Sequence, residues 1–299
     1  METLPVIQVE QLSKKFGYVT AVEGLSFEIN QGEIFGFLGP NGAGKTTSIR
    51  MILDLLRPDS GSIRLFGKAL AGNSVETRSR CGYLPGNFLA YGNLTGLEYL
   101  RLNSSLRGLH FNMDEDLIYR LGLDRKYLSR KIKALSHGTM QKLGIIQAFM
   151  HKPDLLILDE PTIGLDPLMQ EEFYILLKEA QADGSTIFLS SHNLSEVERI
   201  CHRMAIIKDG KLVVTDKIEN LRKTLNRKLH IVVSQEIGNI ELPNAEMTGR
   251  DGLSFDFIIH DDIRPVLKKL AELPVTDVSI PEPGLEEIFI QYYKNKGHE

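Results

Sequence analysis

The sequence predicts an α/β fold with a parallel sheet, followed by a smaller α+β domain. Three short apolar runs indicate the sheet, at residues 33–38, 155–158 and 186–189. The run 155–158 is continuously apolar, as in a parallel strand that is buried on both faces. Each run leads directly into glycine, acidic or serine residues. Since ligands bind at the carboxyl ends of the strands in open α/β sheets, these polar residues predict a site.

The composition is that of an ordinary globular chain. The 299 residues are 42% apolar and 25% charged, which excludes disorder as the main state. A formal net charge of −4 argues against nucleic acid as a partner. With only Cys81 and Cys201, no disulfide framework or multi-cysteine metal site can form, and we expect a reducing compartment.

No apolar run approaches the roughly 18 residues that a membrane-spanning helix needs. The first ten residues, 1–10, carry acids and lack a basic segment before an apolar one. We therefore expect that the chain neither spans a membrane nor is exported by an ordinary signal peptide.

The first apolar run ends in a glycine-rich loop. Residues 39–46 match the pattern G-x-x-x-x-G-K-[ST], and Ile49, Ile52 and Leu53 follow at helical spacing. Glycines allow successive N–H groups to turn toward a polyphosphate, and the start of the next helix adds its positive dipole. The predicted phosphate-binding residues are Gly39, Pro40, Asn41, Gly42, Ala43, Gly44, Lys45, Thr46 and Thr47.

Three side chains of this loop have separate expected roles. Lys45 would reach the β- and γ-phosphates, Thr46 would ligate magnesium, and Thr47 would donate to the α-phosphate. The alternative is a glycine-rich turn between two core elements with an exposed lysine. Because the whole pattern and both flanking elements agree, we favour the phosphate site.

Two carboxylates, Asp159 and Glu160, end the second apolar run. If this strand neighbours the strand before the phosphate loop, both acids would face the same crevice. Asp159 would orient magnesium or its waters, and Glu160, which points the other way, would polarise the attacking water. The alternative is a strand-end turn or a helix cap by Asp159.

The third apolar run leads into Ser190, Ser191 and His192. One predicted helix, residues 171–182, separates it from the acidic strand, so the right-handed βαβ rule places His192 beside the same crevice. We therefore interpret His192 as a ligand of the γ-phosphate, although a lone histidine after a strand is usually an ordinary loop residue.

A further turn, residues 134–142, begins a helix that runs through Met150. By itself it indicates only a helix cap at Ser136. The motifs follow one another as the phosphate loop, this signature turn, residues 155–160, residues 164–167 and residues 191–192. Together, these motifs make the chain resemble the nucleotide-binding subunit of ABC ATPases. The resemblance covers residues 4 to about 215, with five motifs in the order and at the spacing of the family.

The resemblance implies a role for each matching position. Phe16 would stack on adenine, with Tyr18 as a fallback because tyrosine is more usual in the family. Ser136 and Gly138 would grip the γ-phosphate held by a second subunit. The remaining assignments are Asp159 for magnesium, Glu160 as catalytic base, Asp166 in the dimer contact, and His192 as switch histidine.

The same resemblance implies an activity. Two copies, or one copy and a similar subunit, would sandwich two ATP molecules, and hydrolysis with Mg²⁺ would reopen them. A separate transmembrane permease would carry the cargo, and this ATPase subunit would lie in the cytoplasm on the inner face of the membrane. The ATPase domain would cover residues 1–215, with a helical subdomain at about 87–150.

Two positions depart from the family pattern. His137 stands where glycine is most common in the signature turn, beside the phosphate contact. Gly86 stands where the family usually has Gln or Glu to link magnesium to the membrane partner. Because glycine has no side-chain ligand, we expect Asn87 or water to replace it.

The C-terminal region, residues 216–299, has the pattern of a small α+β domain without paired acids at a strand end. Residues 281–289 resemble the tail of ABC subunits that serve drug, lipid and polysaccharide exporters, and a structural, dimer-supporting or regulatory role is expected. The predicted elements are helices at 216–225, 263–270 and 285–293, and strands at 229–233, 253–259 and 275–280.

Two other classes of function remain as alternatives, namely a soluble ABC ATPase of chromosomes or ribosomes and a nucleotide-binding regulator without turnover. A soluble ABC ATPase of chromosomes would need a long coiled coil between Lys45 and Gly138, for which the sequence has no room. A ribosomal ABC ATPase would usually carry two such domains and basic linkers. A nucleotide-binding regulator without turnover would lack a base, whereas Glu160 is present. The sequence therefore favours the ATPase subunit of an exporter.

Overall fold

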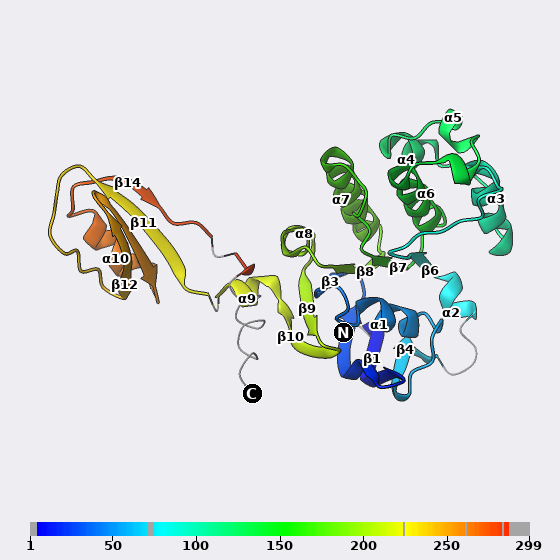
Figure 1. The fold of residues 1–299 in the computed structure, drawn as a ribbon, viewed down its shortest axis with the longest axis horizontal. Coiled ribbons are helices and arrows are strands. Elements are labelled where there is room, and N and C mark those ends of the chain that lie inside the picture. The colour runs from blue at the N-terminus through cyan, green and yellow to red at the C-terminus, as the bar shows by residue number, and fades with distance from the viewer. Residues whose placement is uncertain (1–4, 71–74, 224, 261, 283, 287–299) are drawn as a thin grey trace. The chain divides into compact units, whose positions relative to one another are not determined.

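The computed structural model describes residues 5–70, 75–223, 225–260, 262–282 and 284–286. The chain divides into two compact units, residues 1–217 and 218–299 (Figure 1). Each unit has its own sheet structure and its own core, and each is described by itself.

The first unit is built on a six-stranded sheet of order β10-β9-β3-β8-β7-β6. The five strands from β9 to β6 are parallel, and β10 is an antiparallel edge strand joined to β9 by a turn at residues 209–210. The strands are β3 (Ile34–Leu38), β6 (Cys81–Leu84), β7 (Leu155–Asp159), β8 (Thr186–Ser191), β9 (Arg203–Lys208) and β10 (Lys211–Lys217). The predicted α/β fold with a parallel sheet is confirmed.

The strand order answers a condition that the sequence left open. The strand before the phosphate loop, β3, and the acidic strand, β7, are not neighbours, because β8 lies between them. Leu38 pairs with Ser191, and Asp159 pairs with Ser190, so all three strands end at the same edge of the sheet. The polar residues still converge, but through β8.

A second, antiparallel sheet covers one face of the first. It contains β1 (Pro5–Phe16), β2 (Val19–Asn30), β4 (Ser60–Leu65) and β5 (Lys68–Ala69). Helix α1 (Lys45–Ile52) contacts both β2 and β7 and packs into the core between the sheets (Figure 1). Phe27 of β2 stacks on Phe35 and Phe37 of β3, with ring centroids 5.8 and 5.6 Å apart. This aromatic contact fixes the base of the phosphate loop.

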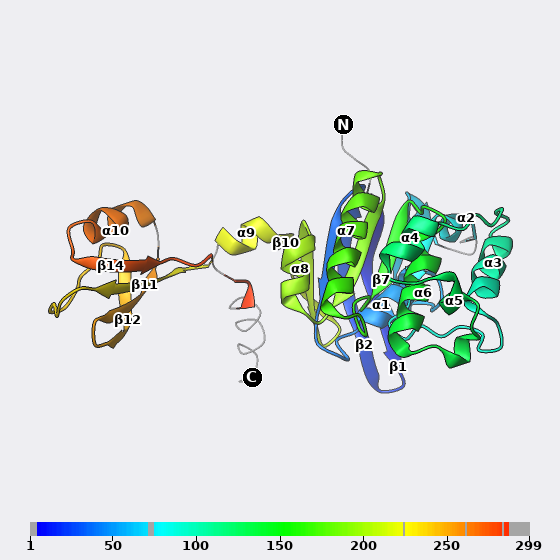
Figure 2. The ribbon, with the colours of Figure 1, turned by 90° about the horizontal axis from the view of Figure 1, so that it is seen from above.

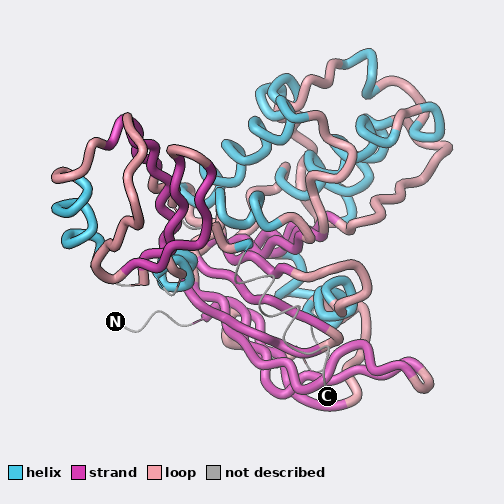
Figure 3. Tube along the Cα trace, turned by 60° about the vertical axis from the view of Figure 1, so that its left-hand side comes forward, coloured by secondary structure: helices cyan, strands magenta, loops and turns pink. Residues whose placement is uncertain are grey.

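Helices cover the other face of the six-stranded sheet (Figures 1 and 3). They are α6 (His137–Phe149), α7 (Pro167–Ala182) and α8 (Leu194–Ile200). Helix α7 begins four residues before the predicted start, because Asp166 caps it and Pro167 occupies the first turn. The predicted helical region from residue 87 becomes helical only at residue 96, where Thr95 and Glu98 form a capping box.

The remaining helices of this unit are short. They are α2 (Val75–Ser79), α3 (Gly96–Leu106), α4 (Glu115–Arg120), α5 (Arg125–Leu128) and a 3₁₀ turn at Ile132–Ala134.

The second unit is a four-stranded antiparallel sheet of order β12-β13-β11-β14, with α10 on one face (Figure 2). Val266 and Leu270 of α10 join Ile231, Phe255 and Phe257 in its core. Its elements are α9 (Ile218–Lys223), β11 (Arg227–Val233), β12 (Ala245–Asp251), β13 (Ser254–Ile259), α10 (Ile263–Leu270) and β14 (Val275–Ser279).

The sequence analysis did not predict β12, because this edge strand is mostly exposed and polar. The predicted final helix at 285–293 lies outside the described residues beyond Glu286, as do residues 283 and 287–289 of the tail that resembles exporter subunits.

We predict that Gly82→Ala destabilises the first unit. A Cβ at residue 82 would lie 2.2 Å from the backbone oxygen of Ala148, where β6 contacts α6, so the strand or the helix must move. Such overpacking commonly costs about 1–3 kcal/mol. Chemical denaturation measures this, with Gly238→Ala as the control because a Cβ there meets nothing within 4 Å. Equal unfolding midpoints for the two variants would contradict the tight packing.

Candidate functional site

The phosphate loop is held by close backbone contacts. Gly39 donates its N–H to the carbonyl of Ser191 at 3.2 Å. Gly44 has φ +106°, and a Cβ there would lie 2.5 Å from the backbone oxygen of Ala21. A Cβ at Gly39 would lie 2.5 Å from the oxygen of Ile207. These two positions therefore require glycine, and the glycine pattern has a steric cause.

The loop surrounds a small hollow at the start of α1. The hollow has a volume of about 180 Å³. The first turn of α1 contains no acidic residue, so its positive end favours an anion. The residues that line it are Ala21, Pro40, Asn41, Gly42, Gly44, Lys45, Thr46, Thr47 and Glu160. The arrangement suits a polyphosphate chain.

Lys45 is folded over this loop and nearly buried, with 6% of its side chain exposed. Its Nζ donates to the carbonyls of Gly39 at 2.6 Å and Pro40 at 3.1 Å. The same ammonium group forms an ion pair with Glu160 Oε1 at 3.0 Å. Lys45 therefore connects the loop to the acidic strand within one chain.

Asp159, which is 1% exposed, is held by two hydroxyl groups. Thr46 Oγ1 donates to its Oδ2 at 2.7 Å, and Ser190 Oγ donates to its Oδ1 at 2.5 Å. The N–H of Glu160 donates to the backbone oxygen of Ser190 at 3.1 Å and also approaches its Oγ at 3.2 Å. Ser190 thus positions both acidic residues.

Sequence reasoning missed Ser190. The only signal was its place in the pair of serines at the end of a strand, next to His192. Its importance follows from β8 lying between β3 and β7, which the sequence did not predict.

The carboxylate of Glu160 lies between two basic groups. Its Oε2 is 2.7 Å from His192 Nδ1, and its Oε1 pairs with Lys45. The backbone of Glu160 is left-handed, with φ +51°, which is uncommon for a residue other than glycine and costs about 1–3 kcal/mol. This strained turn lets the two consecutive acids make separate contacts, Asp159 with Thr46 and Glu160 with Lys45 and His192.

The oxygens of Thr46 and Asp159 fit a magnesium ion, which prefers hard oxygen ligands. In the described ranges of the chain, no group of three or more His, Cys, Asp or Glu residues could hold a metal by itself. Bound phosphates would therefore have to complete the coordination. Gly86 lies beside this pair, since a Cβ there would be 3.3 Å from Asp159 Oδ2.

Eight predicted residues do not line the hollow. Gly39 and Ala43 belong to the phosphate loop itself, and Asp159 and His192 contact the lining residues Thr46 and Glu160. The other four lie on separate segments: Phe16, Ser136, Gly138 and Asp166. Ser136 caps α6 by accepting from the N–H of Thr139 at 3.2 Å. Asp166 caps α7 by accepting from the N–H of Met169 at 3.0 Å. In a single chain, these two side chains stabilise helix starts.

The predicted adenine-stacking residue lies at the end of β1. Phe16 is half exposed, and Lys14 Nζ lies 5.7 Å from the centre of its ring. Tyr18, in the turn before β2, is fully exposed. Both rings are accessible to a planar ligand.

The signature turn packs against the loop that follows Glu160. A Cβ at Gly138 would lie 2.7 Å from the backbone oxygen of Gly164, and a Cβ at Gly164 would lie 2.8 Å from His137 Cδ2. His137 therefore stands against the loop of its own chain, and its larger side chain is accommodated by the glycine opposite.

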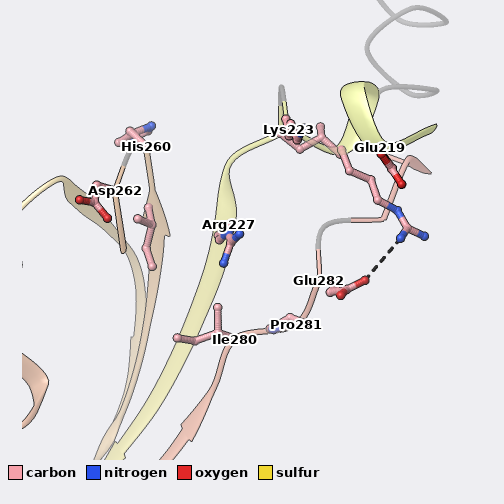
Figure 4. Close-up of a pocket in the computed structure, with 11 residues that line it drawn as sticks. Glu219, Lys223, Arg227, His260, Asp262, Ile280, Pro281 and Glu282 are labelled. Atoms are coloured by element: carbon pink, nitrogen blue, oxygen red, sulfur yellow. Dashed lines mark hydrogen bonds and ion pairs between the residues drawn. The ribbon is translucent and has the colours of Figure 1, made fainter. Parts of the chain in front are cut away.

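A larger cavity lies within the second unit, with a volume of about 590 Å³. Figure 4 shows Lys223, Arg227 and His260 around it, together with Glu219, Asp262 and Glu282. Basic and acidic side chains alternate around this cavity, and Arg222 pairs with Glu282 at 3.4 Å. The smaller hollow in the first unit, by contrast, brings together the residues suited to phosphate chemistry.

No helix in the described part of the chain is both long and apolar enough to cross a bilayer.

Comparisons with known proteins identify the family of the chain. Residues 22–163 match the family described as ABC transporter. The chain is 34% identical to the bacitracin transport ATP-binding protein BcrA of Bacillus licheniformis, over 96% of each chain. It is also 34% identical to the Nod factor export ATP-binding protein I of Ralstonia nicotianae, over 78% of this chain and 70% of that one.

Among solved structures, the fold is similar to one described as the ATP-binding subunit of an ABC transporter. The TM-score is 0.67 at 32% identity, and the match covers 73% of this chain and 92% of that chain.

We predict that Lys45→Ala weakens binding of a triphosphate nucleotide by about 2–5 kcal/mol, because a buried charge that would meet the phosphates is lost. Titration with a fluorescent ATP analogue measures the affinity. The matched control is Lys68→Ala, since Lys68 is exposed and pairs with Glu76 on the surface. An unchanged affinity in Lys45→Ala would show that the hollow is not the phosphate site.

Proposed function

The chain belongs to the ABC transporter family as an ATP-binding, ATP-hydrolysing subunit, and from this premise we propose that it drives export through a separate membrane protein. One observation supports export as the direction, since the relative Nod factor protein I is named for export. BcrA, which is named for transport, aligns over 96% of this chain and supports the transport role. The proposal places this subunit on the cytoplasmic side of the membrane, next to its permease.

The observation that carries the hydrolytic role is the placement of Glu160 between Lys45 and His192. In the proposed reaction, Glu160 accepts a proton from water as the water oxygen attacks the γ-phosphorus. The bond between the γ-phosphorus and the oxygen that bridges the β- and γ-phosphates breaks, which yields ADP and phosphate. His192 holds the base in position through the contact between its Nδ1 and Glu160 Oε2.

The ion pair with Lys45 adds a control on this base. While the ammonium group lies 3.0 Å from Glu160 Oε1, that carboxylate oxygen is engaged by Lys45. A γ-phosphate competes for the same ammonium group. We infer that arrival of the substrate draws Lys45 away and frees Glu160 Oε1 to contact the attacking water.

Magnesium belongs to this proposal. Thr46 and Asp159 would hold it, and the bound ion would neutralise charge on the phosphates. The hydrogen bond from Ser190 keeps Asp159 oriented toward Thr46. Gly86 provides no side-chain ligand beside them, and Asn87 is exposed, so water or Asn87 would fill that part of the shell.

A second subunit completes the proposed site. Ser136 and Gly138 stand at the start of α6, away from the hollow of their own chain. The positive end of that helix suits an anion, and another subunit would supply its γ-phosphate. Because that contact requires ATP, hydrolysis would loosen the dimer, and the cycle would move the permease.

We predict that Glu160→Gln binds ATP normally but hydrolyses it about 10²- to 10⁴-fold more slowly, because the amide cannot accept the proton. The variant should accumulate as a dimer in Mg-ATP, which light scattering with size-exclusion chromatography measures. The Lys45→Ala variant serves as the monomeric control. If Glu160→Gln hydrolysed ATP at the native rate, Glu160 could not be the base.

We also predict that the tagged chain, purified from native membranes in mild detergent, brings with it a protein with several membrane-spanning helices. Mass spectrometry identifies the partner, and the untagged strain is the control. Recovery of ribosomes or DNA in place of a membrane protein would contradict the exporter function.

A further inference from the structure

One buried carboxyl group near the catalytic residues has no role in the mechanism above. Glu196, in the first turn of α8, is 3% exposed and lies four residues after His192. Ser191 Oγ donates to its Oε2 at 2.6 Å. Its other oxygen, Oε1, is buried and has no hydrogen-bond partner among the residues that the structure describes. A buried polar atom without a partner is costly, so its presence calls for a cause.

Charged and polar groups surround this carboxyl on several elements. Burial raises the pKa of Glu196, the negative charge of Glu160 raises it further, and Ser191, Thr162 and His192 lower it. Burial, together with the nearby Glu196, raises the pKa of Tyr174 on α7 to about 12. For Glu196 itself burial is the largest effect, so its pKa lies above the ordinary value for a glutamate.

Through Ser191, Glu196 is connected to the backbone on both sides of His192. The Ser191 hydroxyl accepts from the N–H of Asn193 at 2.9 Å, and the Ser191 carbonyl accepts from the N–H of Gly39 at 3.2 Å. The carboxyl of Glu196 therefore fixes the short segment that carries His192 and ties it to the start of the phosphate loop.

On its other side, Glu196 meets the loop between Glu160 and Asp166. A side-chain hydrogen bond with Thr162 is one of the effects that lower the pKa of the Glu196 carboxyl, so Thr162 lies beside it. This loop is otherwise held by Gln141 Nε2, which donates to the carbonyl of Pro161 at 2.8 Å. The carboxyl of Glu196 thus lies beside the segment that connects the base to the predicted dimer contact.

His192 needs such external support. About half of its side chain is exposed, and Glu160 is the hydrogen-bond partner of its ring in the described structure. A half-exposed ring with little packing holds its position only as well as its backbone does. A misplacement of about 1 Å in a catalytic group can cost about 10²-fold in rate.

We propose that Glu196 is a positioning residue for ATP hydrolysis: it joins Ser191 to the Thr162 loop and thereby keeps His192 in register with Glu160. It acts through His192 and does not touch the nucleotide. The proposal rests on the ATPase function above and deepens it.

The test compares Glu196→Ala, which removes the carboxyl, with Glu196→Gln, which keeps its size and its hydrogen bonding. We expect Glu196→Ala to lower kcat about 10- to 100-fold, with nucleotide affinity unchanged within about twofold. Glu196→Gln should retain kcat within about threefold. Ser195→Ala is the matched control, because Ser195 is an exposed residue of the same helix turn.

A double-mutant comparison tests whether Glu196 acts through His192. In a His192→Ala background, Glu196→Ala should reduce the remaining rate by less than about twofold, because the ring that it positions is already gone. Multiplicative losses would overturn the proposal, as would a native kcat in Glu196→Ala or an equal loss of nucleotide affinity.

A spectroscopic measurement separates this proposal from the ATPase function itself. The imidazole NMR signals of His192, assigned with His192→Ala, should shift in Glu196→Ala and remain in place in Glu196→Gln and Ser195→Ala. If Glu196→Ala does not fold, Thr162→Val takes its place, since it removes only the facing hydroxyl. Signals unchanged in Thr162→Val and Glu196→Ala would overturn the proposal even if the wild type hydrolyses ATP as expected.

Discussion

The site depends on one electrostatic arrangement, in which the Glu160 carboxylate is shared by Lys45 and His192. The three side chains come from three separate segments, namely the start of α1, the end of β7 and the end of β8. Lys45 and Glu160 are both nearly buried, so their attraction is less screened than that of a surface pair. A phosphate that competes for Lys45 changes the charge around Glu160 directly. Substrate binding and activation of the base are therefore linked through one ammonium group.

Strand β8 makes this arrangement possible. It lies between β3 and β7, and its terminal serines reach the segments on both sides. Ser190 holds Asp159 and the N–H of Glu160, while Ser191 contacts Gly39 and Glu196. Uncharged hydroxyl groups thus hold the catalytic residues in position relative to one another. A loss of either hydroxyl would leave buried partners unsatisfied, so the strand end behaves as a unit.

Sequence reasoning predicted the parts of the fold whose pattern is local. The apolar strands, the glycine loop and the amphipathic helix at 263–270 each carry their own signal, and the structure confirms them. The antiparallel sheet of β1, β2 and β4 was not predicted, because its long strands contain bulges that break the alternation of apolar residues. The edge strand β12 was missed because it is mostly exposed.

The site could be predicted only in part, because only some of its residues belong to a local sequence motif. Lys45, Asp159, Glu160 and His192 follow from motifs, and the structure places them together. Ser190 and Glu196 are ordinary residues in sequence, and their contacts arise from strand order and helix packing. The left-handed backbone of Glu160 is likewise a property of the folded chain.

The most direct measurement of this account is a double-mutant cycle on the free energy of unfolding in the absence of nucleotide. It compares Lys45→Met, Glu160→Gln and the double variant with the wild type. The account predicts a favourable coupling of about 1–3 kcal/mol between the two side chains, since both are buried and 3.0 Å apart. Additive effects, with no coupling, would show that Lys45 does not hold the Glu160 carboxylate and would contradict the account.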